Sequence, residues 1–193
     1  MKNAEFECRR CGNIASAKQY ETSRFCPNCG TFLTPKPQPK HWLFQFNPSI
    51  YNWFDRIKET KQPEQWLVSQ HFNLIKKGDL AAIWSSGQKA GIYALGQIIT
   101  NPKKEPLNPA QQKYFLNKND IHKFQEKPSV YLEYLNLYIK KPLLQEKCSQ
   151  DTTLSDMQVL ISPQGTNFRL TPKQWTRILS GLTGTDNENN IGT

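Results

Sequence analysis

Four cysteines near the start of the chain are the residues whose spacing most clearly indicates chemistry. Cys8 and Cys11 form one Cys-x-x-Cys pair, and Cys26 and Cys29 form a second pair after fourteen intervening residues. Two such pairs supply four thiolates, the ligand set of a closed tetrahedral zinc site. Because sulfur would fill every position, none is left for a catalytic water, and we expect a structural zinc. A redox dithiol or an iron–sulfur cluster remains the alternative.

A glycine follows each pair, Gly12 after the first and Gly30 after the second. Glycine supplies the backbone dihedrals that let the chain turn tightly enough for two sulfurs to face one ion. We therefore expect a zinc ribbon, a unit too small to fold without its metal. Within it, Arg9 and Arg10 are candidates for contacts with phosphate groups, and a solvated surface is the alternative for both.

Aromatic side chains beside short polar ones form a second group of candidates. Trp66 and Trp84 are expected near one end of adjacent strands, with Ser69 and Ser85 close to them in the sequence. A flat aromatic face next to a small hydroxyl group suits a pocket for a planar base. Core packing is an equally weighted alternative for either tryptophan.

Short apolar runs predict the strands that position these residues. Three runs between residues 66 and 100 are separated by the turn at 77–79 and the polar break at 85–87, a pattern typical of strands. Residues 41–46 predict an earlier strand. Asn47 is then expected to cap a helix that carries Trp53 on its apolar stripe.

The remaining half of the chain gives weaker signals. Residues 101–128 predict a long polar excursion, in which Lys103 and Lys104 either face phosphate groups or belong to a solvated loop. A strand is expected over 129–140, a helix or a strand over 154–161, and a final helix capped at Thr171. Five to seven strands with few helices indicate an α+β protein built on a small β-barrel.

The predicted boundaries follow from composition. We expect a zinc ribbon over residues 1–34 and a linker over 35–40, where prolines alternate with other residues. A second domain is expected over 41–182 and a disordered tail over 183–193.

The chain carries a net charge of +9 in 193 residues. A basic surface is attracted to phosphate backbones and to anionic membranes, and it can also serve only for solubility. No apolar run approaches the ~20 residues needed to cross a bilayer, so no membrane partner is expected. The first residues lack the apolar core of an export signal, so we expect a cytoplasmic location.

An ordered set of motifs carries a resemblance to a known family. The set runs Phe46-Asn47-Pro48, then Tyr51 and Trp53, Trp66 with Ser69, Ile75 to Asp79, Ile83 to Ser86, and Gly91 to Gly96. This pattern resembles an EVE domain, a member of the PUA-like barrel class related to YTH and ASCH domains. The resemblance is clearest over residues 41–102.

The resemblance implies a module that recognises modified bases. YTH domains hold N6-methyladenine in an aromatic cage, and EVE domains have been linked to methylated or hydroxymethylated cytosine in DNA. Trp66 looks like the position that opens the cage in YTH relatives. The expected base-binding residues are Asn47, Tyr51, Trp53, Trp66, Ser69, Trp84, Ser85 and Gln88. The expected phosphate contacts are Arg9, Arg10, Lys89, Lys103 and Lys104.

We therefore expect a non-catalytic reader that flips a base into an aromatic pocket, with modified cytosine in DNA favoured over RNA. By family analogy its context is modification-dependent restriction or defence, with a separately encoded nuclease as a partner. Two alternatives stay open. One is an ASCH-like hydrolase acting on a nucleotide or base, for which Lys89 is the nearest candidate residue. The other is a protein-interaction adaptor.

Overall fold

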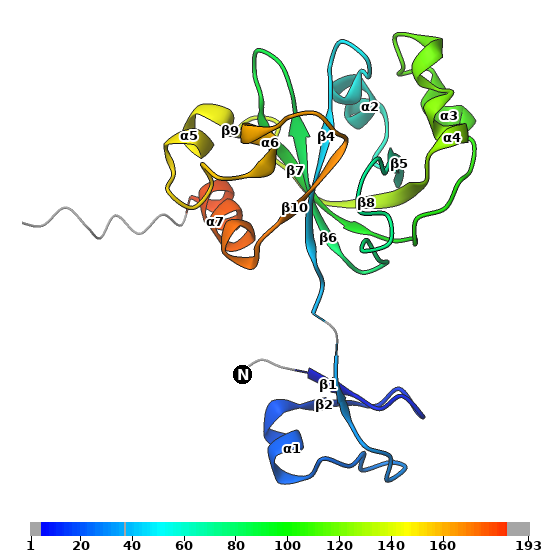
Figure 1. Ribbon diagram of the computed structural model, residues 1–193, viewed down its shortest axis with the longest axis vertical. Coiled ribbons are helices and arrows are strands. Elements are labelled where there is room, and N and C mark those ends of the chain that lie inside the picture. Colours follow the sequence, from blue (N-terminus) through cyan, green and yellow to red (C-terminus); the bar gives the residue numbers. More distant parts are fainter. Residues whose placement is uncertain (1–4, 37, 185–193) are drawn as a thin grey trace, which may run out of the picture. The chain divides into compact units, whose positions relative to one another are not determined.

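The computed structural model describes residues 5–36 and 38–184, which divide into two compact units between Gln38 and Pro39 (Figure 1). The predicted linker at 35–40 spans this division. The predicted disordered tail at 183–193 lies outside the described residues from position 185 onward.

The first unit is a three-stranded antiparallel sheet with one helix. Its strands are β1 (Glu5–Glu7), β2 (Ile14–Ser16) and β3 (Thr34–Pro35), in the order β2-β1-β3. Ser16 caps helix α1 (Ala17–Thr22) through a capping box, which satisfies backbone donors at the start of the helix. The buried core contains Phe6, Cys8, Ala15, Cys26 and Leu33. A buried core this small is typical of units that a metal or a disulfide cross-links.

The second unit is built on a curled, seven-stranded mixed sheet. Its strands are β4 (His41–Phe46), β5 (Glu64–Leu67), β6 (Leu80–Ser85), β7 (Gly91–Ile98), β8 (Ser129–Leu137), β9 (Leu143–Leu144) and β10 (Asn167–Leu170). The strand order is β10-β4-β6-β7-β8-β5, with β9 paired to β7. Only the β4–β6 pair among these strands is parallel. The predicted α+β class is confirmed, and the expected small β-barrel takes the form of a curled half-barrel sheet.

Helices lie on both sides of this sheet (Figure 1). They are α2 (Trp53–Glu59), α3 (Pro109–Gln112), the 3-10 turn η1 (Lys118–Asp120), α4 (Lys123–Glu126), α5 (Gln145–Gln150), α6 (Gln158–Ile161) and α7 (Pro172–Thr183). Helices α5 to α7 gather on one side, and α2 to α4 lie on the other. Thr171 caps α7 as expected, with Pro172 in the first helical turn.

Side chains alternate along the strands and so divide between two buried clusters. In β4, Trp42 and Phe44 enter one cluster, whereas Leu43 enters the other. We call the first the cavity side, which packs beneath α2 and the segment from α3 to α4. We call the second the helix side, which packs beneath α5 to α7. Along β4 and β6, the parity of a residue therefore decides which side its side chain reaches.

Two expectations about local structure need correction or refinement. Asn47 does not cap α2, because the helix begins six residues later, after the N-cap Asn52. Asn47 instead closes a turn: its side-chain oxygen accepts from the Ser49 amide at 2.9 Å, and its carbonyl accepts from Ile50 at 2.9 Å. Such Asx turns compete with helix capping for the same side chain. The undecided segment 154–161 ends in a helix, α6.

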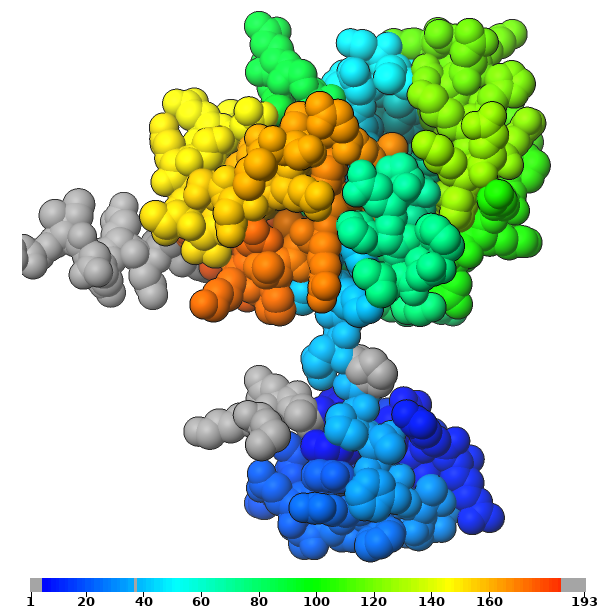
Figure 2. All heavy atoms as spheres, viewed as in Figure 1, coloured from blue at the N-terminus to red at the C-terminus, as the bar shows by residue number. Residues whose placement is uncertain are grey.

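The two edge strands of the sheet, β5 and β10, are joined by side-chain hydrogen bonds. Asn167 Oδ1 accepts from the backbone amides of Ser69 and Gln70, each at 3.0 Å. Thr166 Oγ1 donates to the Leu67 carbonyl at 3.0 Å. We call this contact between residues 67–70 and 166–167 the seam. In Figure 2 the teal segment near residue 70 lies directly against the orange segment that precedes β10.

Candidate nucleic-acid interface

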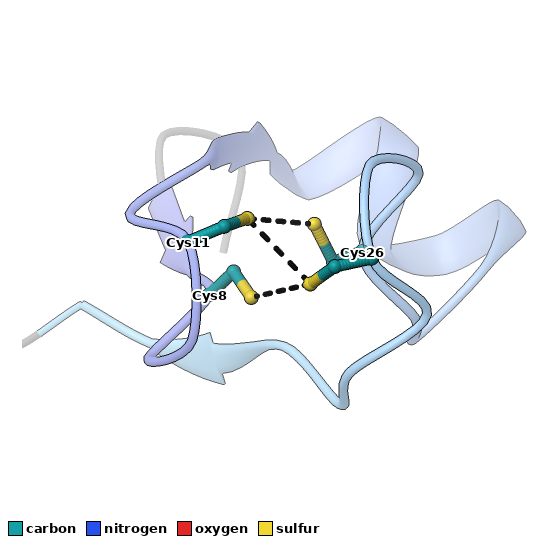
Figure 3. Close-up of side chains that lie close together, drawn as sticks. Cys8, Cys11 and Cys26 are labelled. Carbon is teal, nitrogen blue, oxygen red and sulfur yellow. Dashed lines mark hydrogen bonds between the residues drawn. The ribbon is translucent and has the colours of Figure 1, made fainter.

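The four cysteine sulfurs of the first unit converge on one point (Figure 3). All four lie within 4.8 Å of one another, with Cys8 and Cys29 at 3.4 Å and Cys11 and Cys26 at 3.5 Å. Sulfurs about 2.3 Å from a tetrahedral zinc lie about 3.8 Å apart. The donor set and its spacing therefore fit a zinc ion held by four thiolates.

Two matching turns bring these sulfurs together. The Gly12 amide donates to the Cys8 carbonyl at 2.8 Å, and the Gly30 amide donates to the Cys26 carbonyl at 2.9 Å. The glycines have φ values of +71° and +68°, in the left-handed region that other residues rarely adopt. The predicted role of both glycines is confirmed.

The second unit contains a cavity of about 310 Å³ beside the seam. Five aromatic rings contribute to its wall: Phe46, Tyr51, Trp66, Phe115 and Phe124. Its polar lining residues are Gln45, Asn47, Glu64, Gln65, Ser86, Gln111, Asp120, Lys123 and Thr166. We call this space the seam cavity. An apolar wall with a limited set of polar groups is typical of a ligand site.

The aromatic wall is held by packing within the cavity side. The ring of Trp66 meets Phe46 edge to face, with centroids 6.3 Å apart, and meets Phe44 in the same way at 6.0 Å. Tyr51 and Phe115 lie 4.6 Å apart across an isolated β-bridge. These contacts place rings from β4, β5 and the segment after α3 around one space.

A buried charged network supports one wall of the seam cavity. The carboxylate of Glu64 is fully buried and lies 3.3 Å from the Arg56 guanidinium. It also accepts hydrogen bonds from the hydroxyls of Tyr51 and Tyr134. Burial raises the pKa of Glu64, while Arg56 and the two hydroxyls act in the opposite direction. Burial and the adjacent carboxylate raise the pKa of Tyr51, which keeps its hydroxyl protonated as a donor.

The structure brings only some of the predicted base-binding residues to the seam cavity. Asn47, Tyr51 and Trp66 line it. The Ser69 hydroxyl accepts a hydrogen bond from the backbone amide of the lining residue Thr166 at 3.0 Å, so Ser69 supports the rim. Trp53 is fully buried in the cavity-side core, where its Nε1 donates to the Tyr134 hydroxyl at 2.7 Å.

Trp84 does not lie beside Trp66. The expectation that their strands are adjacent is wrong, because β7 and β8 separate β6 from β5 in the sheet order. The side chain of Trp84 is buried on the helix side, whereas Trp66 belongs to the cavity side. Ser85 is also buried, and its neighbour Ser86 lines the cavity instead.

The other candidates lie elsewhere. Gln88 and Lys89 line a second, open hollow of about 810 Å³, together with Tyr93 and Lys140. Lys103 and Lys104 are exposed in the strand-like segment that pairs with the start of β8. Arg9 and Arg10 are exposed in the first unit.

Several lining residues had no sequence signal. Gln45 alternates with the large apolar residues of β4, so it resembled an ordinary solvent-facing position. Thr166 and Lys123 lie in polar segments remote from Trp66 in the sequence. Thr166 reaches the cavity through the closing of the seam, and Lys123 reaches it from α4; no local pattern encodes either approach.

No helix within the described ranges, 5–36 and 38–184, is both long enough and apolar enough to cross a membrane.

Comparisons with known proteins identify relatives of the second unit. Residues 40–181 match the family model for the EVE domain. A solved protein from Rhodopseudomonas palustris, Rpa0253, superimposes with a TM-score of 0.56 at 16% identity, covering 80% of this chain and 99% of its own. Human THYN1, solved in complex with 5-methylcytosine-containing DNA, gives a TM-score of 0.53 at 17% identity, covering 74% of this chain and 97% of its own. A comparison with curated proteins returned no match. The family resemblance expected from the sequence is confirmed.

Proposed function

The chain belongs to the EVE domain family, and we propose that its second unit binds one modified base of a nucleic acid in the seam cavity, without catalysing a reaction on it. Modified cytosine in DNA is the proposed ligand. The observation that carries this proposal is the cavity of about 310 Å³ walled by aromatic rings. The complex of THYN1 with 5-methylcytosine-containing DNA supports the choice of ligand.

The size of the cavity favours a single base over a stretch of helix. Ligand pockets span about 300–1,000 Å³, and this one lies at the lower end. A base inside a duplex is stacked and paired, so it must be flipped out to enter such a space. Stacking on an aromatic wall contributes about 1–3 kcal/mol per base, and polar groups on the wall add chemical identity.

The basic surface would supply affinity that does not depend on sequence. Lys123 lies at the cavity, and Lys89, Lys103 and Lys104 are exposed on the same unit. Lysines that contact phosphates release condensed counterions, which makes binding weaken as salt rises. We propose these lysines, with Arg9 and Arg10 of the first unit, as backbone contacts.

The first unit is proposed to hold a structural zinc through Cys8, Cys11, Cys26 and Cys29. Metal analysis of the full chain should find about one zinc per molecule, lost on Cys8→Ser. A full complement of zinc in Cys8→Ser would contradict the four-ligand site. By analogy, the context is restriction or defence, in which this protein recruits a separately encoded nuclease.

Binding to matched oligonucleotides tests the proposed function. Fluorescence anisotropy at fixed salt would compare unmodified, 5-methylcytosine, 5-hydroxymethylcytosine and N6-methyladenine probes, as DNA and as RNA. We expect tighter binding of one modified-cytosine DNA, weakened at least about fivefold by Trp66→Ala, the lower end of a stacking contribution. Trp175→Ala is the matched control, because Trp175 is similarly buried but lies on the helix side.

Equal binding of all probes by the wild type, unaffected by Trp66→Ala, would refute the proposal. It would leave a generic nucleic-acid-binding or adaptor role.

A hydrolase of the ASCH type is the second candidate, and Glu64 is the observation that favours it. This carboxyl lines the cavity, and burial raises its pKa, as in many catalytic acids. However, both of its oxygens are already held by the tyrosine hydroxyls, with Arg56 alongside, which is typical of a supporting network. Mass spectrometry of the same probes after incubation should detect no product. Turnover that Glu64→Gln abolishes would establish the hydrolase instead.

A further inference from the structure

The open hollow of about 810 Å³ lies beside the seam cavity and has no part in the proposed base site. We call it the second hollow. Its lining is partly aromatic, with Phe54 half-buried and Tyr93 buried beside it. Among the described residues, the lining has two lysines, Lys89 and Lys140, and one acidic residue, Glu146. An aromatic surface beside cationic side chains is what proteins that bind single nucleic-acid strands present.

The second hollow and the seam cavity share a wall. Phe46 lines the seam cavity, Phe54 lines the second hollow, and their ring centroids lie 5.8 Å apart. Ser86 lines the seam cavity, and the next residue, Gly87, lines the second hollow. The Ser86 amide donates to the Phe46 carbonyl at 2.9 Å, which ties the two parts of the wall together. At this wall, one layer of side chains separates the two spaces.

The topology explains why the two spaces are neighbours. Strands β4 and β6 run parallel, and their last residues, Phe46 and Ser85, are paired. The chain therefore leaves both strands at the same end of the sheet, toward α2 from β4 and into the hairpin 86–90 from β6 (Figure 1). The first residue of this hairpin lines the seam cavity, and the rest of it lines the second hollow.

The hairpin 86–90 is fixed by hydrogen bonds to the elements around it. The Tyr93 hydroxyl donates to the Lys89 carbonyl at 2.8 Å. The Gln145 amide, at the start of α5, donates to the Ala90 carbonyl at 2.8 Å. These contacts hold the backbone that carries Lys89, while its side chain stays exposed. A wall that is already in place loses less conformational entropy when a ligand binds.

We propose that the second hollow binds the nucleotide next to the modified base, with its base stacked on Phe54 and the adjoining phosphates on Lys89 and Lys140. This inference rests on the proposed function and adds a second contact with the same strand. The second hollow is larger than the seam cavity, as a whole nucleotide with its sugar and phosphate requires. Because every base has a π face, this contact adds affinity without selecting one neighbouring base.

Removing a neighbouring base tests the proposal without any variant. Single-stranded DNAs would each carry one 5-methylcytosine, with an abasic site directly before it, directly after it, or near the end of the strand. Single strands remove the cost of opening a duplex. In anisotropy titrations we expect one of the two adjacent abasic sites to weaken binding at least about fivefold, the lower end of a stacking contribution. The site near the end should have little effect.

Phe54→Leu keeps an apolar side chain but removes the aromatic face. It should reduce the penalty of the adjacent abasic site to about twofold or less. Phe72→Leu is its matched control, because Phe72 is also exposed in part but precedes β6, at the opposite end of that strand from the hairpin. Unfolding midpoints of all variants would verify that each is folded.

The lysines are tested through the salt dependence of binding. Lys89→Gln and Lys140→Gln should each lower the slope of log affinity against log salt concentration by about 0.7, the value for one phosphate contact on a single strand. Lys77→Gln should leave the slope unchanged, because Lys77 is exposed in the turn before β6, remote from the hairpin.

The outcomes separate this inference from the proposed function. The inference is overturned if both adjacent abasic sites bind as tightly as the intact strand, if Phe54→Leu keeps the full penalty, or if both lysine variants keep the wild-type salt slope. The base reader would then stand, and the second hollow would serve another occupant, such as an acidic peptide. If no modified base binds better than its unmodified counterpart, the proposed function itself fails.

Discussion

The two sides of the curled sheet contain similar aromatic residues but differ in what else they bury. The helix side packs Trp84 and Trp175 with aliphatic side chains, Cys148 and Met157. The cavity side packs Trp42, Trp53 and Trp66, and it also buries Glu64 with its partner Arg56. Only the cavity side borders the seam cavity.

The difference shows that covering elements, and not tryptophan content, decide where a space remains. The helix side is covered by α7, a helix of twelve residues, with α5 and α6 beside it. The cavity side is covered near the seam by short pieces, α3 and α4, each of four residues. Short helices cover a surface less closely than a long amphipathic helix does. The polar groups at their ends also require hydrogen-bonding partners when they are buried.

The largest expected effect is the loss of Trp84. Trp84→Ala should lower the free energy of unfolding by about 3–5 kcal/mol, because it opens a cavity in a dry core. Trp66→Ala should cost less, since solvent can enter the space it leaves beside an existing cavity, but it should weaken base binding. Urea unfolding of both variants measures the two losses of stability. A larger loss of stability for Trp66→Ala would contradict the distinction between the two sides.

Removing the buried carboxylate should have the next largest effect. Glu64→Leu leaves Arg56 charged, buried and without its partner, and should destabilise the protein by about 3 kcal/mol. Adding Arg56→Met should recover most of that loss, because the double variant buries no charge. Unfolding free energies of the two single variants and the double variant test this. Losses that simply add would show that the two residues do not interact as a pair.

The sequence predicted the parts of this molecule that depend on local patterns. The cysteine spacing and the following glycines specify two turns, and the alternating residues of 41–46 specify a strand. Asn47 shows that even a local pattern can mislead. The same side chain can close a turn or cap a helix, and the residues that follow it determine which of the two forms.

The seam cavity depends on contacts that are remote in sequence. Trp66 could be selected by family resemblance, but Gln45 and Thr166, which line the same cavity, lie far from it in the sequence. Asp79 illustrates the same limit: it has the sequence of a turn residue, yet its buried carboxylate accepts from the Trp42 indole at 2.8 Å and the Lys40 amide at 2.9 Å. Pairings of this kind follow from topology.

Opening the seam should have an intermediate effect. Asn167→Ala leaves the Gln70 amide without its acceptor and leaves the Ser69 amide with only Thr166 Oγ1 at 3.1 Å, and it should lower the free energy of unfolding by about 2 kcal/mol. Hydrogen exchange of those two amides should become faster than in the wild type. Arg169→Ala is a suitable control, since Arg169 lies on the same strand and is exposed. Unchanged exchange in Asn167→Ala would mean that the seam is held by other contacts.

The smallest expected effect concerns His41 on the helix side, whose ring stacks on Trp175 with centroids 4.8 Å apart. Burial lowers the pKa of His41 below its ordinary value of 6.5, although Asp79 acts in the opposite direction. The unfolded chain therefore takes up a proton before the folded protein does as the pH falls below 6.5. The stabilisation from neutral His41 is complete above that pH and declines as the pH drops through the folded pKa.

His41→Phe keeps a stacked ring that cannot titrate. The wild type should therefore lose stability relative to this variant between pH 7 and pH 5. The loss should be less than about 1 kcal/mol, because the His41 ring is partly exposed. Urea midpoints across this range measure the difference, and a wild type that gains stability relative to the variant in acid would show that the attraction of Asp79 outweighs burial.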